Sequence, residues 1–484
     1  VIEATNYLLS LKPYNAGTQK SAGILIKGGD YITFDGIDVI SNWGEISAGF
    51  MITNATETDG AHYNTIKNSV IGDTGIYKIT IGILQSSSIY EGGGVTPSSA
   101  EGTNSNNKYY NISVQKAGYG IWLHGDLVYK DSNCEIGSTT DSLITTIGAP
   151  VLGAISSNDY LLDVYGIYLI YQKDFKVFNT EVRNCRGYRN NDEVSGIKAV
   201  FCSGTSSIYN CKIHDIKTMS PYYQDPVYGI CTNAYDSTAV INIHNNSVYA
   251  INHYDIQFPS QDMCVFGIYT SDIDAIVYNN SVRIDEDYKI TSTAYRYNGL
   301  GSGYSLSIMN NVFANYSSGN SNSRRYCLDL NCGPPKQLNN NTYYIITGTN
   351  NYIGCINVQN CSTLSHWRTA SGKENNSNFG EPGFLSVSNL LPDSTSYNCW
   401  YLYGKGMPIA EIETDIRGLS RSTIIATGPT CIGAYEFTTN TSPPVATASG
   451  SPVAGDTTFY TQSERDILSI LWGTGGANKQ NNGN

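Results

Sequence analysis

The sequence predicts an all-β chain wound as a right-handed parallel β-helix, a solenoid of stacked coils. A six-residue pattern recurs seven times: an apolar residue, Asn two positions later, and another apolar residue three positions after the Asn. From Asn210 onward the copies are spaced by 35, 34, 31 and 30 residues. No long segment has the apolar rhythm of a helix. A repeat of this length is therefore typical of stacked short strands rather than of helical hairpins.

Each Asn of the pattern is expected at a turn between two short strands, because Asn tolerates left-handed backbone angles better than most residues. Asn side chains in successive coils can also bond one another, as amide ladders do. Val182-Asn184 begins a further copy, which breaks at Gly187. The predicted ladder consists of Asn68, Asn111, Asn210, Asn245, Asn279, Asn310 and Asn340.

A second marker, a Gly-Ile pair, precedes several of these asparagines by 12 to 18 residues. Each repeat therefore contains at least two short strands, a fixed turn and a loop of variable length. On the spacing of neighbouring strands, roughly 12 to 14 coils give a rod about 60–65 Å long. The pairs are Gly166-Ile167, Gly196-Ile197, Gly229-Ile230 and Gly267-Ile268.

The chain divides into four parts on composition. Residues 1–20 are expected to cap the first coil, because a solenoid end exposes strand edges and apolar core. Residues 21–437 carry the coils, with more irregularity after 345, and with long loops at 87–107 and 140–160. Residues 438–457 are rich in Thr, Ser, Pro and Ala, which favours a linker.

Residues 458–484 form a C-terminal tail in which a short helix is expected from Ser463. Such a helix is not stable alone, so it is expected to dock on its own rod as a cap, on another copy, or on an anchor. Its apolar face consists of Ile467, Leu468, Leu471 and Trp472.

Charge and composition exclude some partners. The net charge is −12, with a pI near 5.0, whereas nucleic-acid binding needs a basic stripe. No apolar run is long enough to span a membrane. No signal peptide is visible, and the chain is expected to be a mature or trimmed product.

The chain has 12 cysteines. Cys327/Cys332 and Cys355/Cys361 are spaced for local disulfides, which would suit an extracellular protein, or they are buried free thiols. Cys185 and Cys211 are expected to fill neighbouring coils as small apolar side chains. The spacings give no pair of Cys-x-x-Cys units, so a structural zinc site is not expected.

Several stretches stand out beside the coils: Ile26–Gly36, Leu364–Arg368, Gly372–Ser377, Pro382–Phe384, Asp415–Gly418 with Arg421, and Ile432–Phe437. Together they resemble the secreted, surface-associated parallel β-helix proteins abundant in Bacteroidetes-type bacteria. The resemblance implies export and a β-helical architecture over nearly all of residues 20–437. It leaves activity open, because such proteins include adhesins, matrix components and polysaccharide-active enzymes.

Catalytic residues of a polysaccharide lyase or glycoside hydrolase were sought in the coils. Asp272 and Asp274 are expected on one outward strand face, about 7 Å apart by strand geometry. The expected neighbours in flanking coils are not acidic, which favours a solvated face over a calcium or glycosidase site. No metal or other cofactor is predicted, and calcium has no support from the pattern.

Two further clusters combine acid–base groups. Alternation places Trp122, His124 and Asp126 outward on one line, where an aromatic ring and acid–base groups could bind and act on a sugar. His214-Asp215 with Lys212 is a similar candidate. For each cluster the alternative is an ordinary exposed strand.

The 38 tyrosines are a broader signal, and several are expected outside a core filled by aliphatic side chains. Outward tyrosines can stack on sugars or be buried between molecules, or they simply suit β-structure. The candidates for ligand binding are Trp122, Tyr222 and Tyr223. Tyrosines crowd one stretch, at Tyr222, Tyr223, Tyr228, Tyr235, Tyr249, Tyr254, Tyr269 and Tyr278.

The sequence thus favours an exported structural or adhesive rod at the cell surface. Its expected partners are extracellular polysaccharide or other copies of itself, bound through Tyr- and Asn-rich faces. The alternative is a polysaccharide lyase or glycoside hydrolase, with His124, Asp126, Asp272 and Asp274 as candidate catalytic groups. The fold class alone does not decide between these functions.

Overall fold

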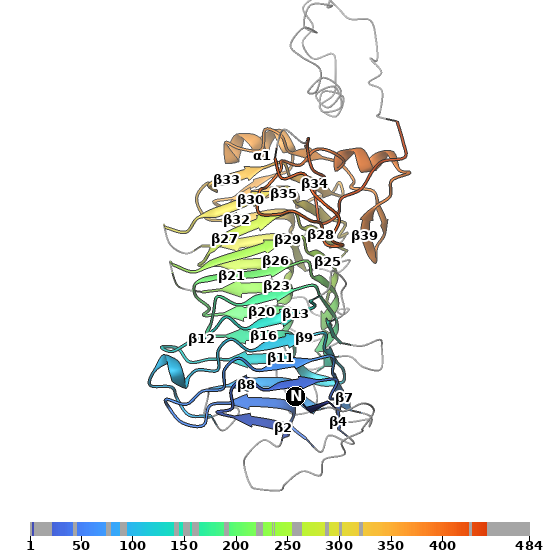
Figure 1. Ribbon diagram of the computed structural model, residues 1–484. Coiled ribbons are helices and arrows are strands. Elements are labelled where there is room, and N and C mark those ends of the chain that lie inside the picture. Colours follow the sequence, from blue (N-terminus) through green and yellow to red (C-terminus); the bar gives the residue numbers. More distant parts are fainter. Residues whose placement is uncertain are drawn as a thin grey trace, which may run out of the picture.

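The computed structural model describes residues 2–3, 22–41, 46–73, 79–87, 94–139, 145–148, 155–156, 164–187, 193–218, 226–234, 236, 238–253, 264–285, 290–299, 303–318, 323–424 and 428–442. These residues are mostly β-strand and form three long sheets stacked along one axis (Figure 1). The predicted linker, from 443 onward, and the whole tail lie outside the described residues, as do Tyr222 and Tyr223. Of the predicted cap, only strand β1 is described.

Three sheets, here called A, B and C, contain 11, 12 and 12 strands. Sheet A consists of β1 (Ile2–Glu3), β3 (Thr33–Asp35), β6 (Thr65–Lys67), β9 (Lys108–Tyr110), β13 (Glu135–Gly137), β18 (Lys176–Phe178), β21 (Thr205–Tyr209), β24 (Val240–His244), β27 (Asp274–Tyr278), β30 (Leu306–Met309) and β33 (Gln337–Asn339).

Sheet B consists of β2 (Ala22–Lys27), β5 (Ala48–Thr53), β8 (Ile79–Ser86), β11 (Ala117–His124), β16 (Val164–Ile170), β20 (Val194–Val200), β23 (Val227–Asn233), β26 (Cys264–Ser271), β29 (Thr291–Asn298), β32 (Arg325–Asn331), β35 (Asn351–Ile356) and β36 (Gln359–Cys361). Sheet C consists of β4 (Val39–Ser41), β7 (Val70–Asp73), β10 (Ser113–Val114), β14 (Thr145–Ile147), β15 (Ile155–Ser156), β19 (Thr180–Gly187), β22 (Lys212–Thr218), β25 (Ser247–Asn252), β28 (Ser281–Ile284), β31 (Val312–Asn315), β34 (Thr342–Ile345) and β37 (Asn378–Phe379).

The chain visits the sheets in a fixed order. From β2 to β34 it steps from sheet B to sheet A to sheet C and back to sheet B, and we call one such set of strands a rung. Neighbouring strands within a sheet are parallel, except for the antiparallel pair β35–β36 at the end of sheet B. The predicted stacking of successive repeats as parallel strands is confirmed.

The core lies between the three sheets and is filled mainly by Ile and Val side chains that point inward. Tyr109, Tyr295, Tyr297 and Tyr343 are also inside, which differs from the expectation of an aliphatic core with tyrosines outside. A tyrosine suits the interior where its hydroxyl finds a partner, as Tyr109 does with Gln85 Oε1 at 2.7 Å.

The Gly-Ile markers form a column of glycines along sheet B, near the corner with sheet C. A Cβ on Gly166 would lie 2.6 Å from the carbonyl oxygen of Gly196, and a Cβ on Gly196 would lie 2.7 Å from that of Gly229. Only glycine fits such an approach. The same column extends to earlier rungs through Gly49, Gly82 and Gly120.

The seven predicted asparagines lie at the corner between sheets A and C, directly after strands that pair in register. All seven have left-handed backbone angles, with φ between 53° and 58°. The turn prediction is therefore confirmed. Asn184 does not belong to this corner, because it lies within β19 of sheet C, and Asn179 (φ 45°) occupies the corner of that rung.

The amide ladder differs from the prediction. The corner asparagines bond one another in two places, from Asn111 Nδ2 to Asn68 Oδ1 at 3.0 Å and from Asn310 Nδ2 to Asn279 Oδ1 at 3.4 Å. In the C-terminal rungs the continuous ladder is instead made by the following residue, which points into the core. Its members are Asn246, Asn280, Asn311 and Asn341.

In this inner ladder each amide is bonded on both sides. Asn280 Oδ1 accepts from the backbone N–H and from Nδ2 of Asn246, both at 3.0 Å. Asn280 Nδ2 donates to the Ile243 carbonyl at 2.8 Å and to Asn311 Oδ1 at 3.0 Å. The side chains thus satisfy buried backbone groups at a turn where no strand partner is available.

The C-terminal end of the core is closed by α1 (Leu364–Ser371), the one α-helix among the described residues (Figure 1). Thr363 caps it through a bond from the His366 N–H, and Gly372 ends it with φ 64°. Trp367 is fully buried against Gly354, and its Nε1–H donates to the buried carboxyl of Glu374 at 3.3 Å. The late stretch that resembles surface β-helix proteins therefore forms this end cap.

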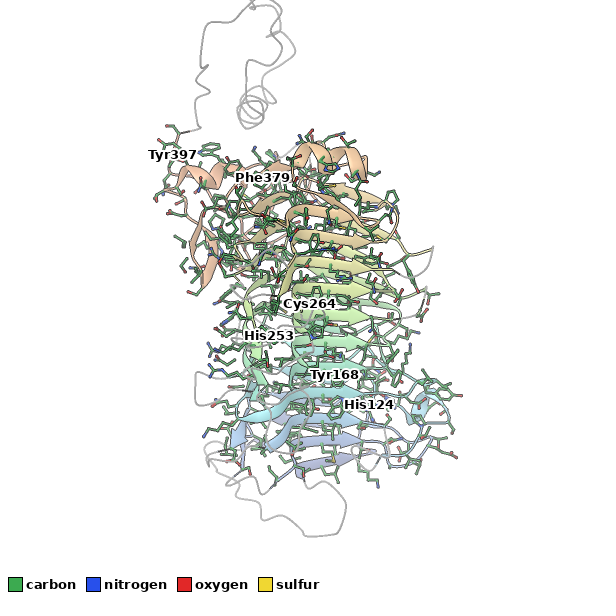
Figure 2. The ribbon with its side chains drawn as sticks, turned by 180° about the vertical axis from the view of Figure 1, so that it is seen from behind. His124, Tyr168, His253, Cys264, Phe379 and Tyr397 are labelled. Atoms are coloured by element: carbon green, nitrogen blue, oxygen red, sulfur yellow. The ribbon has the colours of Figure 1, made fainter. Side chains whose placement is uncertain are left out.

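Residues 380–424 and 428–442, here called the flap, leave the three sheets and lie against the outside of sheet C (Figure 2, where Tyr397 marks the flap). This differs from the expectation that coils continue to residue 437. The flap contains β38 (Phe384–Ser386), β39 (Asn389–Pro392) and a 3-10 helix at Tyr397–Tyr401. Its apolar residues bury Tyr249, Val312 and Ala314 of sheet C.

Carbonyl groups of the flap accept hydrogen bonds from the corner asparagines of the rungs that it covers. Asn340 Nδ2 donates to the Lys405 carbonyl at 2.9 Å, Asn310 Nδ2 to that of Met407 at 2.7 Å, and Asn245 Nδ2 to that of Thr414 at 2.7 Å. At Asn245 and Asn340 these bonds stand in place of the predicted bonds between successive corner amides, whereas Asn310 also keeps its bond to Asn279.

The closing motif holds the flap together. The buried carboxylate of Asp415 accepts from the N–H groups of Arg417, Leu419 and Glu436. The Arg421 side chain is buried, donates to the Gly433 carbonyl at 2.8 Å, and forms an ion pair with Glu436 at 2.5 Å. Burial lowers the pKa of the Arg421 guanidinium, against the opposing charges of Glu436 and Asp415.

All twelve cysteines are free thiols, so neither predicted local disulfide is present. Cys327 Sγ instead donates to the Tyr344 carbonyl at 3.1 Å. Cys185 and Cys211 are fully buried in the core, as expected of small apolar fillers.

Candidate functional site

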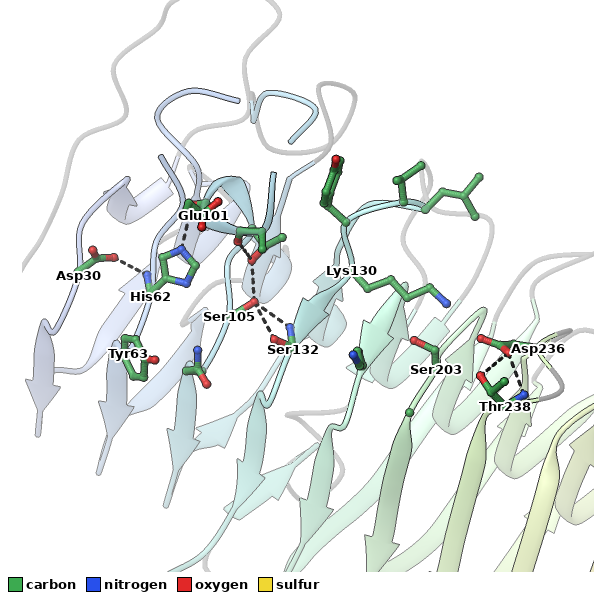
Figure 3. A pocket seen from close by; sticks show the side chains of 18 residues that line it. Asp30, His62, Tyr63, Glu101, Ser105, Lys130, Ser132, Ser203, Asp236 and Thr238 are labelled. Carbon is green, nitrogen blue, oxygen red and sulfur yellow. Dashed lines mark hydrogen bonds between the residues drawn. The ribbon is translucent and has the colours of Figure 1, made fainter. Parts of the chain in front are cut away.

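A groove of about 860 Å³ follows the corner between sheets B and A in the N-terminal part of the stack (Figure 3). Its lining residues come from seven successive B-to-A connections, from Asp30 after β2 to Thr238 before β24. Seven rungs at the spacing of neighbouring strands give a length of about 29 Å. The groove is therefore long, and its lining is mainly polar.

Along the floor, one residue per rung occupies the same position before the turn. These residues are His62, Ser105, Ser132, Lys173 and Ser203. Each of their carbonyl oxygens accepts a hydrogen bond from the left-handed residue of the rung before it, for example Asn133 N–H to Lys173 O at 2.9 Å. This bonding fixes the floor at the spacing of the rungs, so the side chains form an ordered row.

One wall of the groove is the loop of residues 125–131, here called the roof loop, which connects β11 to β12 (Asp131–Ser132). Asp126 Oδ1 holds its first turn by accepting from the N–H groups of Val128 and Tyr129. Leu127 and Val128 at its tip are 64% and 75% exposed. Lys130 extends from the loop across the groove (Figure 3).

The roof loop ends at a buried carboxyl group. Asp131 accepts from the Asn104 N–H at 2.8 Å and from Gln85 Nε2 at 2.7 Å. Burial raises the pKa of Asp131 to about 6, although these hydrogen bonds act in the opposite direction. Asp131 lies under the groove, beside Cys134, and anchors the loop to the rod.

Near the N-terminal end, the groove borders two tyrosine rings on successive rungs. Tyr31 and Tyr63 stack with ring centroids 4.8 Å apart and planes within 1°. Tyr31 is 74% exposed. Exposed, ordered aromatic rings of this kind suit contact with the apolar faces of sugars.

The carboxylates of the groove are occupied by structural hydrogen bonds. Asp30 Oδ1 accepts from the His62 N–H at 2.7 Å. Hydrogen bonds from the Thr238 N–H and hydroxyl lower the pKa of Asp236, and a bond from Ser99 lowers that of Glu101. A glycoside hydrolase needs one carboxyl with a raised pKa as general acid, and neither Asp236 nor Glu101 has it.

A second hollow of about 450 Å³ lies on the outer face of sheet B near the C-terminal end. Arg296 Nε is 3.5 Å from Asp329 Oδ2, so these two charges compensate each other. Burial raises the pKa of Asp329 against the opposing charge of Arg296. The hollow is smaller and crosses fewer rungs than the groove.

The structure separates the predicted cluster on β11. Trp122 and His124 do lie on one outward line, with parallel rings 6.0 Å apart. Trp122 is only 8% exposed, because it packs among Tyr119, Tyr168 and neighbouring apolar residues. Asp126 lies beyond the strand, in the roof loop, and is the one member of the cluster next to the groove.

Asp272 and Asp274 do not share a strand face, contrary to the sequence prediction. Asp272 is at a left-handed turn (φ 48°) between β26 and β27 and is 3% exposed. Asp274 starts β27 and accepts from the Ser305 N–H at 2.6 Å. The alternation rule failed because the turn between them reverses which side a residue faces.

His214 and Asp215 are together on sheet C, with Glu181 from the preceding rung. His214 Nδ1 is 2.6 Å from Asp215 and Nε2 is 3.0 Å from Glu181, while the ring stacks on Tyr249. Burial alone would lower the pKa of His214, but the bonds to Asp215 and Glu181 raise it overall. The imidazole is thus enclosed by its partners, which suits a structural ion cluster better than a substrate site.

No group of three or more His, Cys, Asp or Glu side chains among the described residues could hold a metal ion. In the same part of the chain, no helix is both long and apolar enough to cross a membrane. Comparison with protein-family models, curated proteins and solved structures finds no match. The groove therefore has to be interpreted from its own geometry.

No direct signal for the groove is visible in the sequence. Its residues are single positions spread over seven rungs, and the loops between them differ in length. A signal existed at the turns themselves. Ser105-Asn106, Ser132-Asn133 and Ser203-Gly204 each place a polar residue before a residue suited to left-handed angles.

Proposed function

We propose that the chain is a right-handed parallel β-helix that acts outside the cell as a rigid glycan-binding rod. The fixed order of sheets B, A and C supports the helical winding. Connections between parallel strands of one sheet are overwhelmingly right-handed, which supports the hand. The resemblance to surface-associated β-helix proteins supports the location.

The observation that carries the binding function is the ordered polar row along the groove. A hydroxyl, amide or charged group appears on every rung over about 29 Å. A linear polymer of sugars offers hydroxyl groups at regular intervals and apolar ring faces, which match this row and the adjacent Tyr31 and Tyr63. A compact ligand would use only a small part of such a site.

The same groove favours binding over cleavage. Hydrogen bonds hold Asp30, Asp236 and Glu101, and these bonds lower the pKa of the last two. The proposed function is therefore adhesion to, or organisation of, an extracellular polysaccharide. It needs no bound metal.

The test is to fill the groove without changing its charge. Ser203→Trp places an indole on the groove floor, at a side chain with no hydrogen-bond partner among the described residues. Binding of a panel of neutral and acidic oligosaccharides, measured by calorimetry, should weaken by about tenfold or more for the ligand that binds. Ser207→Trp on β21, four residues on and facing away from the core on sheet A, is the matched control and should bind normally.

Three results would overturn the proposal. Unchanged binding by Ser203→Trp would place the ligand elsewhere. Turnover of an oligosaccharide, followed by new reducing ends or unsaturated products, would replace adhesion by hydrolase or lyase activity. Self-association without any glycan binding, seen by analytical ultracentrifugation, would favour assembly with other copies.

A further inference from the structure

The middle of the groove holds two lysines that form no ion pair with any described residue. The charge of Lys130 does reach Asp236, whose pKa is lowered first by its bonds from Thr238 and also by Lys130. Lys173 belongs to the floor row and Lys130 to the roof loop. Neither ammonium has a hydrogen bond or ion pair to any residue that the structure describes. Both side chains are at least partly exposed to the groove.

Several lysines outside the groove form ion pairs. Lys67 pairs with Asp35 at 3.0 Å, Lys176 with Glu135 at 3.2 Å, and Lys212 with Glu181 at 3.5 Å. In a chain with net charge −12, carboxylates for pairing are plentiful. Lys130 and Lys173 therefore line one groove with ammonium groups that an anionic ligand could use.

Hydroxyl groups flank the floor lysine. Ser132 is paired in register with Lys173 on one side, and Ser203 forms a bridge to Lys173 on the other. The neighbouring rungs lie about 4.8 Å away, within reach of one anionic group. An ammonium group with adjacent hydroxyl donors is a common way to hold a carboxylate or a sulfate.

The charges at the two ends of the groove have the opposite sign. Asp30 and Glu101 lie toward the N-terminal end and Asp236 at the other end (Figure 3). Asp236 is two rungs from Lys173, about 10 Å, and His62 beside Asp30 is three rungs away, about 14 Å. A densely charged polyanion would meet like charges at both ends, whereas a single anionic group at the centre would not.

We propose that the groove selects a glycan in which an acidic sugar, carboxylated or sulfated, is flanked by neutral sugars. The acidic group sits between Lys130 and Lys173, beside the Ser203 hydroxyl. The neutral units extend toward Tyr63 on one side and Thr238 on the other. This inference rests on the proposed glycan-binding function and specifies its ligand.

Four oligosaccharides of equal length test it by calorimetry. One is an alternating oligosaccharide with a single glucuronate between N-acetylglucosamine units, and one is an alternating oligosaccharide with a single sulfated galactose between neutral galactose units. The third is a homopolymer of galacturonate, and the fourth is a neutral glucan. One or both alternating oligosaccharides should bind about tenfold or more tightly than the homopolymer and the neutral glucan. The carboxylated and sulfated probes then distinguish the two kinds of anionic group.

Substitutions of the two lysines test whether the acidic group of the ligand binds between them. Lys173→Gln and Lys130→Gln should each weaken binding of the alternating ligand by about tenfold, and Lys→Arg at either position should retain most of it. Lys336→Gln, an equal charge change on an exposed loop before β33, is the matched control and should bind normally. Melting temperatures are measured in parallel to confirm that each variant folds.

The outcomes separate the two proposals. If the neutral glucan binds as tightly as the alternating ligands, and the lysine variants do not alter binding, the charge selection is wrong while glycan binding stands. If the galacturonate homopolymer binds most tightly, the spacing of charges is wrong. If no oligosaccharide binds, both proposals fail.

Discussion

The corner between sheets A and C and the corner between sheets B and A are alike on the inside and different on the outside. On the inside, both are lined by asparagines that bond buried backbone groups, Asn280 at the first and Asn64 at the second. On the outside, the flap covers the first corner from Asn245 to Asn340. The second corner remains open as the groove from Asp30 to Thr238.

This difference shows what each kind of residue does. The asparagines that recur at regular spacing serve the backbone, because every rung has the same turn to satisfy. The residues that vary from rung to rung, such as Lys173 in a row with Ser132 and Ser203, face the groove. In this protein the residues that repeat on every rung therefore stabilise the fold, and the residues that vary line the groove.

The largest expected effect comes from breaking the inner ladder. Asn280→Ala removes the acceptor of the Asn246 N–H and the donor to the Ile243 carbonyl, and leaves both groups buried. We expect a loss of about 3–5 kcal/mol in unfolding free energy, measured by chemical denaturation.

Asn68→Gly is the matched control at an exposed corner. Glycine adopts the φ of 55° found there without strain, so the expected loss is below about 1 kcal/mol. Equal losses in the two variants would contradict the distinction between inner and outer asparagines.

The second-largest expected effect concerns the flap, which covers the corner between sheets A and C. Arg421→Met leaves the Gly433 carbonyl and the Glu436 carboxylate without their buried partner. We expect the flap to loosen by about 3 kcal/mol while the sheets stay folded. Limited proteolysis should then cut within residues 380–442, and circular dichroism should keep its β-sheet signal.

Arg417→Met provides the comparison within the flap. The Arg417 side chain is 37% exposed and pairs with Asp415 at 3.0 Å, so its loss should cost less than about 1 kcal/mol. If this variant is cut as fast as Arg421→Met, burial of the Arg421 pair is not what holds the flap.

The smallest expected effect concerns Asp131, the buried carboxyl under the groove at the corner between sheets B and A. The pKa of Asp131 is raised from 3.8 to about 6 by burial. A carboxyl with a raised pKa in the folded state contributes stability that is complete below pH 3.8 and is lost as the pH rises through about 6. The unfolding free energy of Asp131→Asn, taken relative to that of the natural protein, should therefore be about 1–2 kcal/mol more favourable to folding at pH 7.5 than at pH 4.

Thermal melts of both proteins at the two pH values measure this gain, and the difference between them removes the contribution of other titrating groups. A difference in melting temperature that does not change with pH would show that the Asp131 carboxyl is not kept from ionising by its burial.

The sequence contains enough to predict the stacking and the turns. Asn210, Asn245 and Asn279 have the predicted left-handed angles, and Gly166 and Gly196 stand in one column. The inner ladder was missed although the doublets Asn245-Asn246 and Asn279-Asn280 are visible, because nothing in the sequence says which of two adjacent amides faces inward.

The flap and the groove could not be predicted in the same way. Both depend on contacts between residues far apart in the chain, such as Asn245 with Thr414, or Lys130 facing the floor formed by Lys173. Alternation along a strand was also a poor guide at its ends, where the turn at Asp272 buries a carboxylate that was expected on the surface.

The roof loop has a consequence for engineering. It is tied at Asp126 and at Asp131, and the exposed residues between these anchors contribute nothing to the core. Residues 127–130 can thus be replaced to change this wall of the groove while the three sheets keep their structure. A library confined to Leu127, Val128, Tyr129 and Lys130 would be the economical starting point for changing the shape and charge of this wall.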